Sequence, residues 1–104
     1  LTFFRKAIEL DPDNIEAYAA MAAMYISYEL KDEAGIIPIQ NEFRKYPSDG
    51  GAHRIIGDLY ILRNMPEAAE AELRKGQELG DWGAELLLSA LKSTKALRQE
   101  KVSR

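Results

Sequence analysis

The side chain best suited to chemistry in this sequence is that of His53, the single histidine. Histidine serves as a general base or as a zinc ligand, but zinc needs three or four ligands and Asp49, four residues earlier, supplies only one more. The chain has no cysteine, which excludes disulfides, thiolate metal sites and cysteine nucleophiles. We therefore expect no metal and no cofactor, and we interpret His53 as a partly buried packing residue.

A group of carboxylates offers a second kind of chemistry. Glu67, Glu70 and Glu72 are close enough in sequence for an acid–base pair, but their segment is rich in Ala, Arg and Lys, where solvated charges are typical. No serine has a histidine and a carboxylate in a plausible arrangement, and Gly50 and Gly51 form no phosphate-binding motif. We expect no catalytic residue and a protein that is not an enzyme.

The elements that carry these residues are all predicted to be helices. Apolar residues recur at helical spacing, as at Tyr18, Met21 and Tyr25, without a sustained alternation of period two. Asp13 and Glu16 predict a capping box at the start of one helix. The expected helices cover residues 2–10, 13–30, 32–46 (capped by Asp32), 51–62, 65–79 and, after a stop at Gly80, 82 to about 92.

The helices repeat along the chain at one fixed offset. Tyr25 and Ala34 return 35 residues later as Tyr60 and Ala69. Self-similarity at such a period indicates stacked units, each of which cannot bury its apolar face without a neighbour.

The repeating residues resemble the signature of the tetratricopeptide repeat family, in which small and large residues stand where two helices and the next repeat interlock. They are Tyr18, Met21, Ala22, Tyr25, Ala34 and Pro47 in one unit, and His53, Ile56, Gly57, Tyr60, Ala69, Leu73 and Gly76 in the next. The resemblance implies an all-α, right-handed helix-turn-helix solenoid with a C-terminal capping helix. It also implies one domain over 1–104: the end of a preceding repeat at 1–12, repeats at 13–47 and 48–81, and a capping helix with a basic tail at 82–104.

One unit departs from the family's spacing. Ala34 and Pro47 are 13 residues apart, one more than in the family, and Pro38 lies inside the predicted helix. We predict a π-bulge near Pro38 that takes up the extra residue. The small residues Ala34 and Ala69 are both predicted to lie where two helices cross closely.

In this family the first helix of each unit lines a concave face that binds a protein or peptide. The basic clamp with which some relatives hold C-terminal carboxylates is absent here, because Ala19 and Ala23 stand at its places. Arg54 and Asp58, four residues apart, either contact the ligand or pair with each other. The resemblance places these side chains in the groove: Glu16, Ala19, Ala20, Ala23 and Ser27 from one helix, and Arg54, Ile55, Asp58 and Leu62 from the next.

The charge balance narrows the classes of partner. The net charge of -3 combines an acidic body with a tail, 92–104, that has five basic residues and one acidic residue. Nucleic acid is not an expected partner, because its binding needs clustered Lys and Arg. No apolar run reaches the roughly 18 residues needed to cross a bilayer, so we expect no membrane partner and take the cytoplasm as the default compartment.

We therefore expect a protein–protein interaction module, a scaffold or adaptor fragment of a larger protein. Two alternatives stay open: a pentatricopeptide-like repeat that binds RNA, which has a similar two-helix period, and a regulatory repeat segment of a larger enzyme. Phe3, Phe4 and Ile8 would lack their usual partner helix, so self-association through the N-terminal helix is a further expectation.

Overall fold

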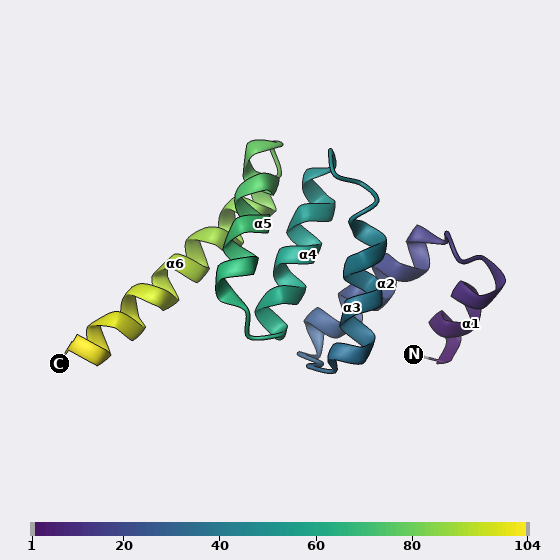
Figure 1. Cartoon of the computed structure of the whole chain (residues 1–104), viewed down its shortest axis with the longest axis horizontal. Helices are drawn as coiled ribbons and strands as arrows, with labels where there is room; N and C mark the ends of the chain where they lie inside the picture. The colour runs from purple at the N-terminus through teal and green to yellow at the C-terminus, as the bar shows by residue number, and fades with distance from the viewer. Residues whose placement is uncertain (1, 104) are drawn as a thin grey trace.

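The computed structural model describes residues 2–103 of the chain, with the side chains of residue 2 and of residues 4–94. The described part contains six helices and no strand, so the predicted all-α fold is confirmed (Figure 1). The helices are α1 (Thr2–Leu10), α2 (Ile15–Ser27), α3 (Glu33–Phe43), α4 (Gly50–Leu62), α5 (Pro66–Glu78) and α6 (Trp82–Ser103).

Side-chain caps determine where several of these helices begin. Asn14 caps α2, because its side chain accepts a hydrogen bond from the backbone N–H of Ala17 at 3.1 Å. The predicted capping box of Asp13 and Glu16 is therefore wrong by one residue. Asp32 caps α3 as expected, accepting from the N–H of Ala34.

The turns inside the two helix pairs repeat at the sequence offset. Glu29 after α2 and Asn64 after α4 both have positive φ, at 51° and 58°. Backbone bonds from Leu30 to Tyr25 and from Met65 to Tyr60 close the two turns at 2.9 and 3.0 Å. This is the Schellman geometry, which satisfies carbonyl groups at a helix C-terminus and ends α2 and α4 at equivalent places.

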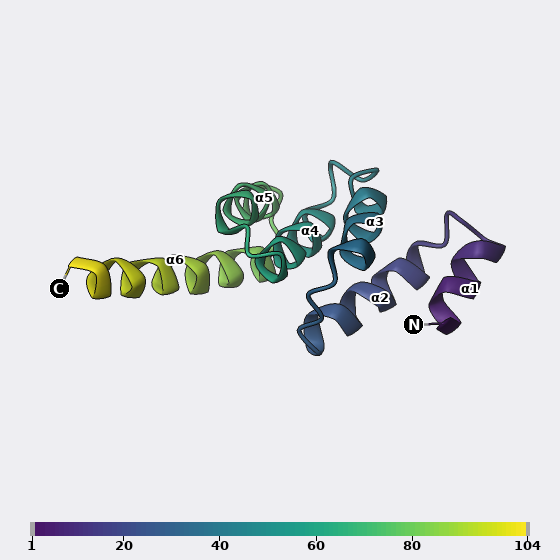
Figure 2. The same ribbon diagram turned by 60° about the horizontal axis from the view of Figure 1, so that its bottom comes forward.

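Helices α3 and α5 lie in one layer and α2, α4 and α6 in the other, with α1 packed against α2 (Figure 2). Consecutive helices pack against each other, and α4 also contacts both α2 and α6. The molecule is elongated, with principal extents of 54 × 27 × 17 Å. The side-by-side placement of α2, α4 and α6 brings the predicted groove residues onto one layer.

Two apolar clusters hold the layers together. The larger cluster is centred on side chains that are almost fully buried, including Tyr25, Ile36, Ile56 and Leu59. The smaller one joins α5 to α6 through Leu73, Ala84 and Leu88. The first turns of α6 therefore cover the open side of α5, as expected of a capping helix. That helix continues past Lys92, where the sequence pattern thins, as far as Ser103.

The pair α2–α3 is packed more loosely than the pair α4–α5. Ala69 is fully buried, whereas Ala34, at the equivalent place, is exposed. Gly35 takes the close contact instead: a Cβ added there would lie 1.8 Å from the Tyr25 hydroxyl oxygen. The prediction of a close helix crossing at Ala34 is therefore wrong, and a cavity of about 340 Å³ lies beside this residue, between α1, α2 and α3.

The extra residue of this unit lies in a connection and not in a bulge. Helix α3 is α-helical throughout, including Pro38, so the predicted π-bulge is wrong. It ends at Phe43, nine residues after Ala34, just as α5 ends nine residues after Ala69. The additional residue therefore follows Phe43, in the 44–49 connection to α4, and this helix stops before the predicted end at residue 46.

Candidate functional site

The groove side chains expected on α2 are largely open to solvent. Glu16, Ala19, Ala23 and Ser27 are exposed, and Ala20 is half-buried. Apart from Glu16 these side chains are small, so the exposed face of α2 carries little side-chain bulk. Buried Ala17, Met21, Ala22 and Tyr25 hold the other face against the core.

The groove side chains expected on α4 have more varied surroundings. Ile55 and Leu62 are half-buried and pack against the larger apolar cluster, so they contribute to stability as well as to the face of α4. Arg54 does not form the suggested ion pair with Asp58. Its Nε donates instead to Oδ2 of Asp81 at 2.9 Å, and the same Oδ2 accepts from the N–H of Ala84 at 2.8 Å.

Arg54 therefore positions α6 against α4. Asp81 caps the first turn of α6 and pairs with Arg54 at the same time, so α6 is attached to α4 at its N-terminal end. Gly83 permits this approach, because an added Cβ would lie 2.8 Å from Cδ of Arg54.

Asp58 is left as a partly buried carboxyl group. No hydrogen bond or ion pair engages it among the residues whose side chains are described. Burial raises the pKa of Asp58 above its ordinary value, and the nearby charge of Arg54 offsets this only in part. The carboxylate thus loses hydration without gaining a partner of its own.

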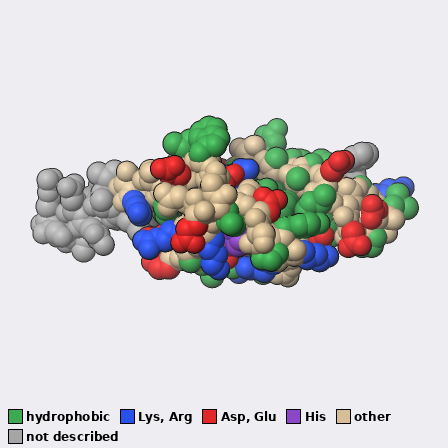
Figure 3. All heavy atoms as spheres, turned by 90° about the horizontal axis from the view of Figure 1, so that it is seen from above, with side chains coloured by type: hydrophobic (Ala, Val, Ile, Leu, Met, Phe, Trp, Pro, Cys, Tyr) green, Lys and Arg blue, Asp and Glu red, His purple; other side chains and the backbone are tan. Residues whose placement is uncertain are grey.

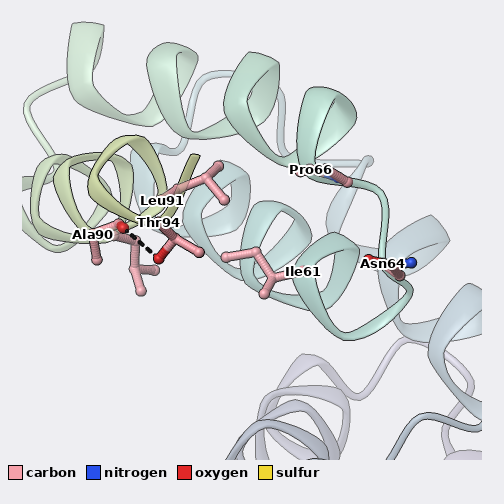
Figure 4. A pocket seen from close by; sticks show the side chains of 7 residues that line it. Ile61, Asn64, Pro66, Ala90, Leu91 and Thr94 are labelled. Carbon is pink, nitrogen blue, oxygen red and sulfur yellow. Dashed lines mark hydrogen bonds between the residues drawn. The ribbon is translucent and has the colours of Figure 1, made fainter. Parts of the chain in front are cut away.

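A cleft of about 230 Å³ opens between α4 and α6 (Figure 4). Ile61 of α4 lies opposite Thr94 and Leu91 of α6 across it, and Asn64, in the turn after α4, lines one end. Its walls are mainly apolar and consist of Ile61, Asn64, Pro66, Leu87, Ala90, Leu91 and Thr94. None of these residues was among the predicted groove side chains. The available signal was the four-residue spacing of Leu87 and Leu91, which lie in the predicted capping segment 82–104.

His53 is held in a hydrogen-bonded network on the other side of α4. Its Nδ1 lies 2.7 Å from Oε2 of Glu72, and its Nε2 lies 2.7 Å from the carbonyl oxygen of Pro47. The donor and acceptor roles of the two ring nitrogens depend on the tautomer of the ring. The expected partly buried structural role of His53 is confirmed. Glu72, expected at the solvated surface, is buried.

A second network joins α3 to α4. Gln40, almost fully buried, donates from Nε2 to the carbonyl oxygen of Ile56 at 3.0 Å and accepts from Arg63 at 2.9 Å. Arg63 and Arg44 both lie over the ring of Tyr60, at 5.4 and 5.6 Å from its centroid. These polar contacts hold α4 in place between α3 and the cleft. The burial of Gln40 could not be predicted from the apolar periodicity of the helix.

Other kinds of site were sought in the described part of the chain. No group of three or more His, Cys, Asp or Glu side chains there is arranged to hold a metal ion. Within the same residues, no helix combines the length and the apolar character that a membrane crossing requires.

Comparison with known proteins gives one finding. A sequence model described as tetratricopeptide repeat matches residues 3–36, from α1 through α2 to the first turn of α3. No curated protein and no solved structure matched the chain. The match covers the α1–α2 turn and the packing face of α2, and the helices beyond it continue as sequential packed pairs. Residues 3–36 are therefore similar to a tetratricopeptide repeat, and the described helices pack in sequential pairs, an arrangement consistent with such repeats.

Proposed function

We propose that the chain is a protein–protein interaction module, part of a scaffold or adaptor, and that it binds a peptide or a helix of its partner along α2, α4 and α6. Proteins with tetratricopeptide repeats generally bind other proteins, which supports the class of partner. The observation that carries the proposal is the apolar cleft between α4 and α6, because apolar anchors in a concave surface supply most of the energy of peptide binding.

The open face of α2 supports the same proposal. Ala19 and Ala23 are exposed on the layer that contains the cleft, so a bound segment could extend from the cleft across α4 to α2. Figure 3 views the molecule from above, along the edge of the two layers, and shows charges of both signs interspersed with apolar side chains there.

The test is a pair of variants on opposite layers. Ala19→Glu with Ala23→Glu places charge and bulk on the α2 face, where both side chains are exposed. Ala71→Glu, at an exposed position of α5, is the matched control on the other layer. The α2 variant should lose binding of peptides selected on the parent chain, and the control should keep it. Equal binding by all three proteins, with unchanged helix content by circular dichroism, would contradict the proposal.

We also propose that the chain self-associates through α1. Phe4 and Ile8 are half-buried and pack against the larger cluster, and the side chain of Phe3 lies outside those that the structure describes. Sedimentation velocity at two protein concentrations separates this from peptide binding: a dimer that Ile8→Glu dissociates would support it, and a monomer at both concentrations would oppose it.

A further inference from the structure

We propose that the cleft between α4 and α6 selects a partner segment in which an apolar side chain is followed or preceded, within one helical turn, by lysine or arginine. The apolar side chain enters the cleft and the cation pairs with Asp58. This inference rests on the proposed function and adds the chemistry of the partner.

The helical register of α4 places Asp58 beside the cleft. Arg54, Asp58 and Ile61 follow one another at spacings of four and three residues, so they share one face of the helix. Arg54, at one end of this row, contacts Asp81 of α6, and Ile61, at the other end, lines the cleft with Leu91 of α6. Asp58 therefore lies on the face of α4 that is turned towards α6, one turn from the apolar cleft.

The charge around Asp58 favours a cationic ligand group. The nearest basic side chain on its own helix, Arg54, donates its Nε to Asp81, and Asp81 is also the cap of α6. Asp58 therefore carries a carboxylate that is partly removed from water and has no hydrogen-bond donor among the described side chains. A lysine or arginine brought by a partner would supply both the donor and the opposite charge.

The size and lining of the cleft favour a side chain over a free small molecule. Its volume of about 230 Å³ is below the range of roughly 300 to 1,000 Å³ typical of pockets for small ligands. The walls are mainly aliphatic, and Ile61 and Ala90 are exposed at them. An aliphatic or aromatic side chain of a peptide would cover these groups while its backbone stays at the surface.

The experiment uses the full chain and a random 12-residue peptide library displayed on phage. Peptides selected on the parent chain should combine an apolar residue with Lys or Arg within four positions. The best of them is then synthesised, and its affinity is measured by fluorescence anisotropy. Asp58→Asn, which keeps the shape of the side chain, should weaken binding about tenfold or more, since a hydrogen bond to a charged group is lost.

A charge exchange separates a direct contact from a structural effect. Asp58→Lys should abolish binding of the basic peptide and bind its counterpart with Glu in place of Lys or Arg. Ala90→Phe, which fills the cleft from an exposed position and leaves Asp58 in place, should weaken both peptides. Circular dichroism confirms that each variant is folded before its affinity is compared.

The outcomes distinguish this inference from the proposed function. Peptides without a basic preference, whose affinity falls with Ala90→Phe and with the α2 variant but not with Asp58→Asn, would overturn the inference and leave the function intact. Peptides insensitive to Ala90→Phe and to the α2 variant would overturn both. Failure to select any binding peptide would also count against both.

Discussion

At the scale of single residues, the role of a side chain depends on its contacts with residues that are distant in the chain. The partly buried, structural character of His53 could be predicted, because one histidine among packing residues makes a poor catalytic or metal site. The hydrogen-bond partners of His53 could not be predicted. Glu72 lies 19 residues away on another helix, and the sequence pattern there is typical of a solvated surface charge. The same holds for Asp58. It has no ion-pair partner in Arg54, because the Arg54 guanidinium donates a hydrogen bond to Asp81 instead.

Asp58 gives a pH prediction with a definite sign. Its folded-state pKa is raised by burial, so the folded chain binds this proton more tightly than the unfolded chain does. The contribution of Asp58 to stability therefore improves as pH falls from neutral towards the ordinary carboxyl value of about 4. We expect Asp58→Asn to be more stable than the parent at pH 7, and the difference to shrink by pH 4. Urea unfolding of both proteins at several pH values measures it, and a difference that grows on acidification would contradict the assignment.

The His53–Glu72 contact predicts coupling between two residues. His53→Phe keeps a ring of similar size but leaves the buried Glu72 carboxylate without its closest donor, so we expect a loss of about 1–3 kcal/mol in unfolding free energy. Glu72→Leu removes the other partner, and the double variant should lose less than the two single losses combined. A double-mutant cycle by urea unfolding decides this. Strictly additive losses would show that the two side chains do not stabilise each other.

At the scale of elements, the number of helices and the spacing of the repeat follow from the sequence, but the quality of packing within each pair does not. The pattern treats Ala34 and Ala69 as equivalent. In the structure Gly35 replaces Ala34 at the close contact, because the ring of Tyr25 occupies the space above it. A shift of one residue in a contact leaves the apolar periodicity almost unchanged, so periodicity alone could not reveal it.

The unequal pairs predict unequal effects of one substitution. Ala69→Leu forces extra methyl groups into a fully buried position and should cost about 1–3 kcal/mol in unfolding free energy. Ala34→Leu places the same groups at an exposed position that borders a cavity, so its midpoint in urea should match or exceed that of the parent. Equal losses in the two variants would mean that α2 and α3 pack as closely as α4 and α5.

At the scale of the whole molecule, the layer of α2, α4 and α6 gives the chain a candidate binding surface that no single helix contains. The contribution of α2 could be predicted from the family resemblance. The contribution of α6 was missed, because Leu87 and Leu91 pack with Leu88 against the end of α5 and also line the cleft with α4. This second role depends on how α6 is attached to α4 through Asp81 and Arg54, and that contact joins residues 27 positions apart.

The most direct test of the proposed binding surface is a two-dimensional NMR titration of the ¹⁵N-labelled full chain with the tightest peptide selected on it. The account predicts that the largest amide shift changes map to Ala19 and Ala23 of α2, Asp58 and Ile61 of α4, and Leu91 of α6. Residues of the outer face of α5, such as Glu67 and Ala71, should change little. Shift changes concentrated on α3 and α5, with those five amides unaffected, would contradict it.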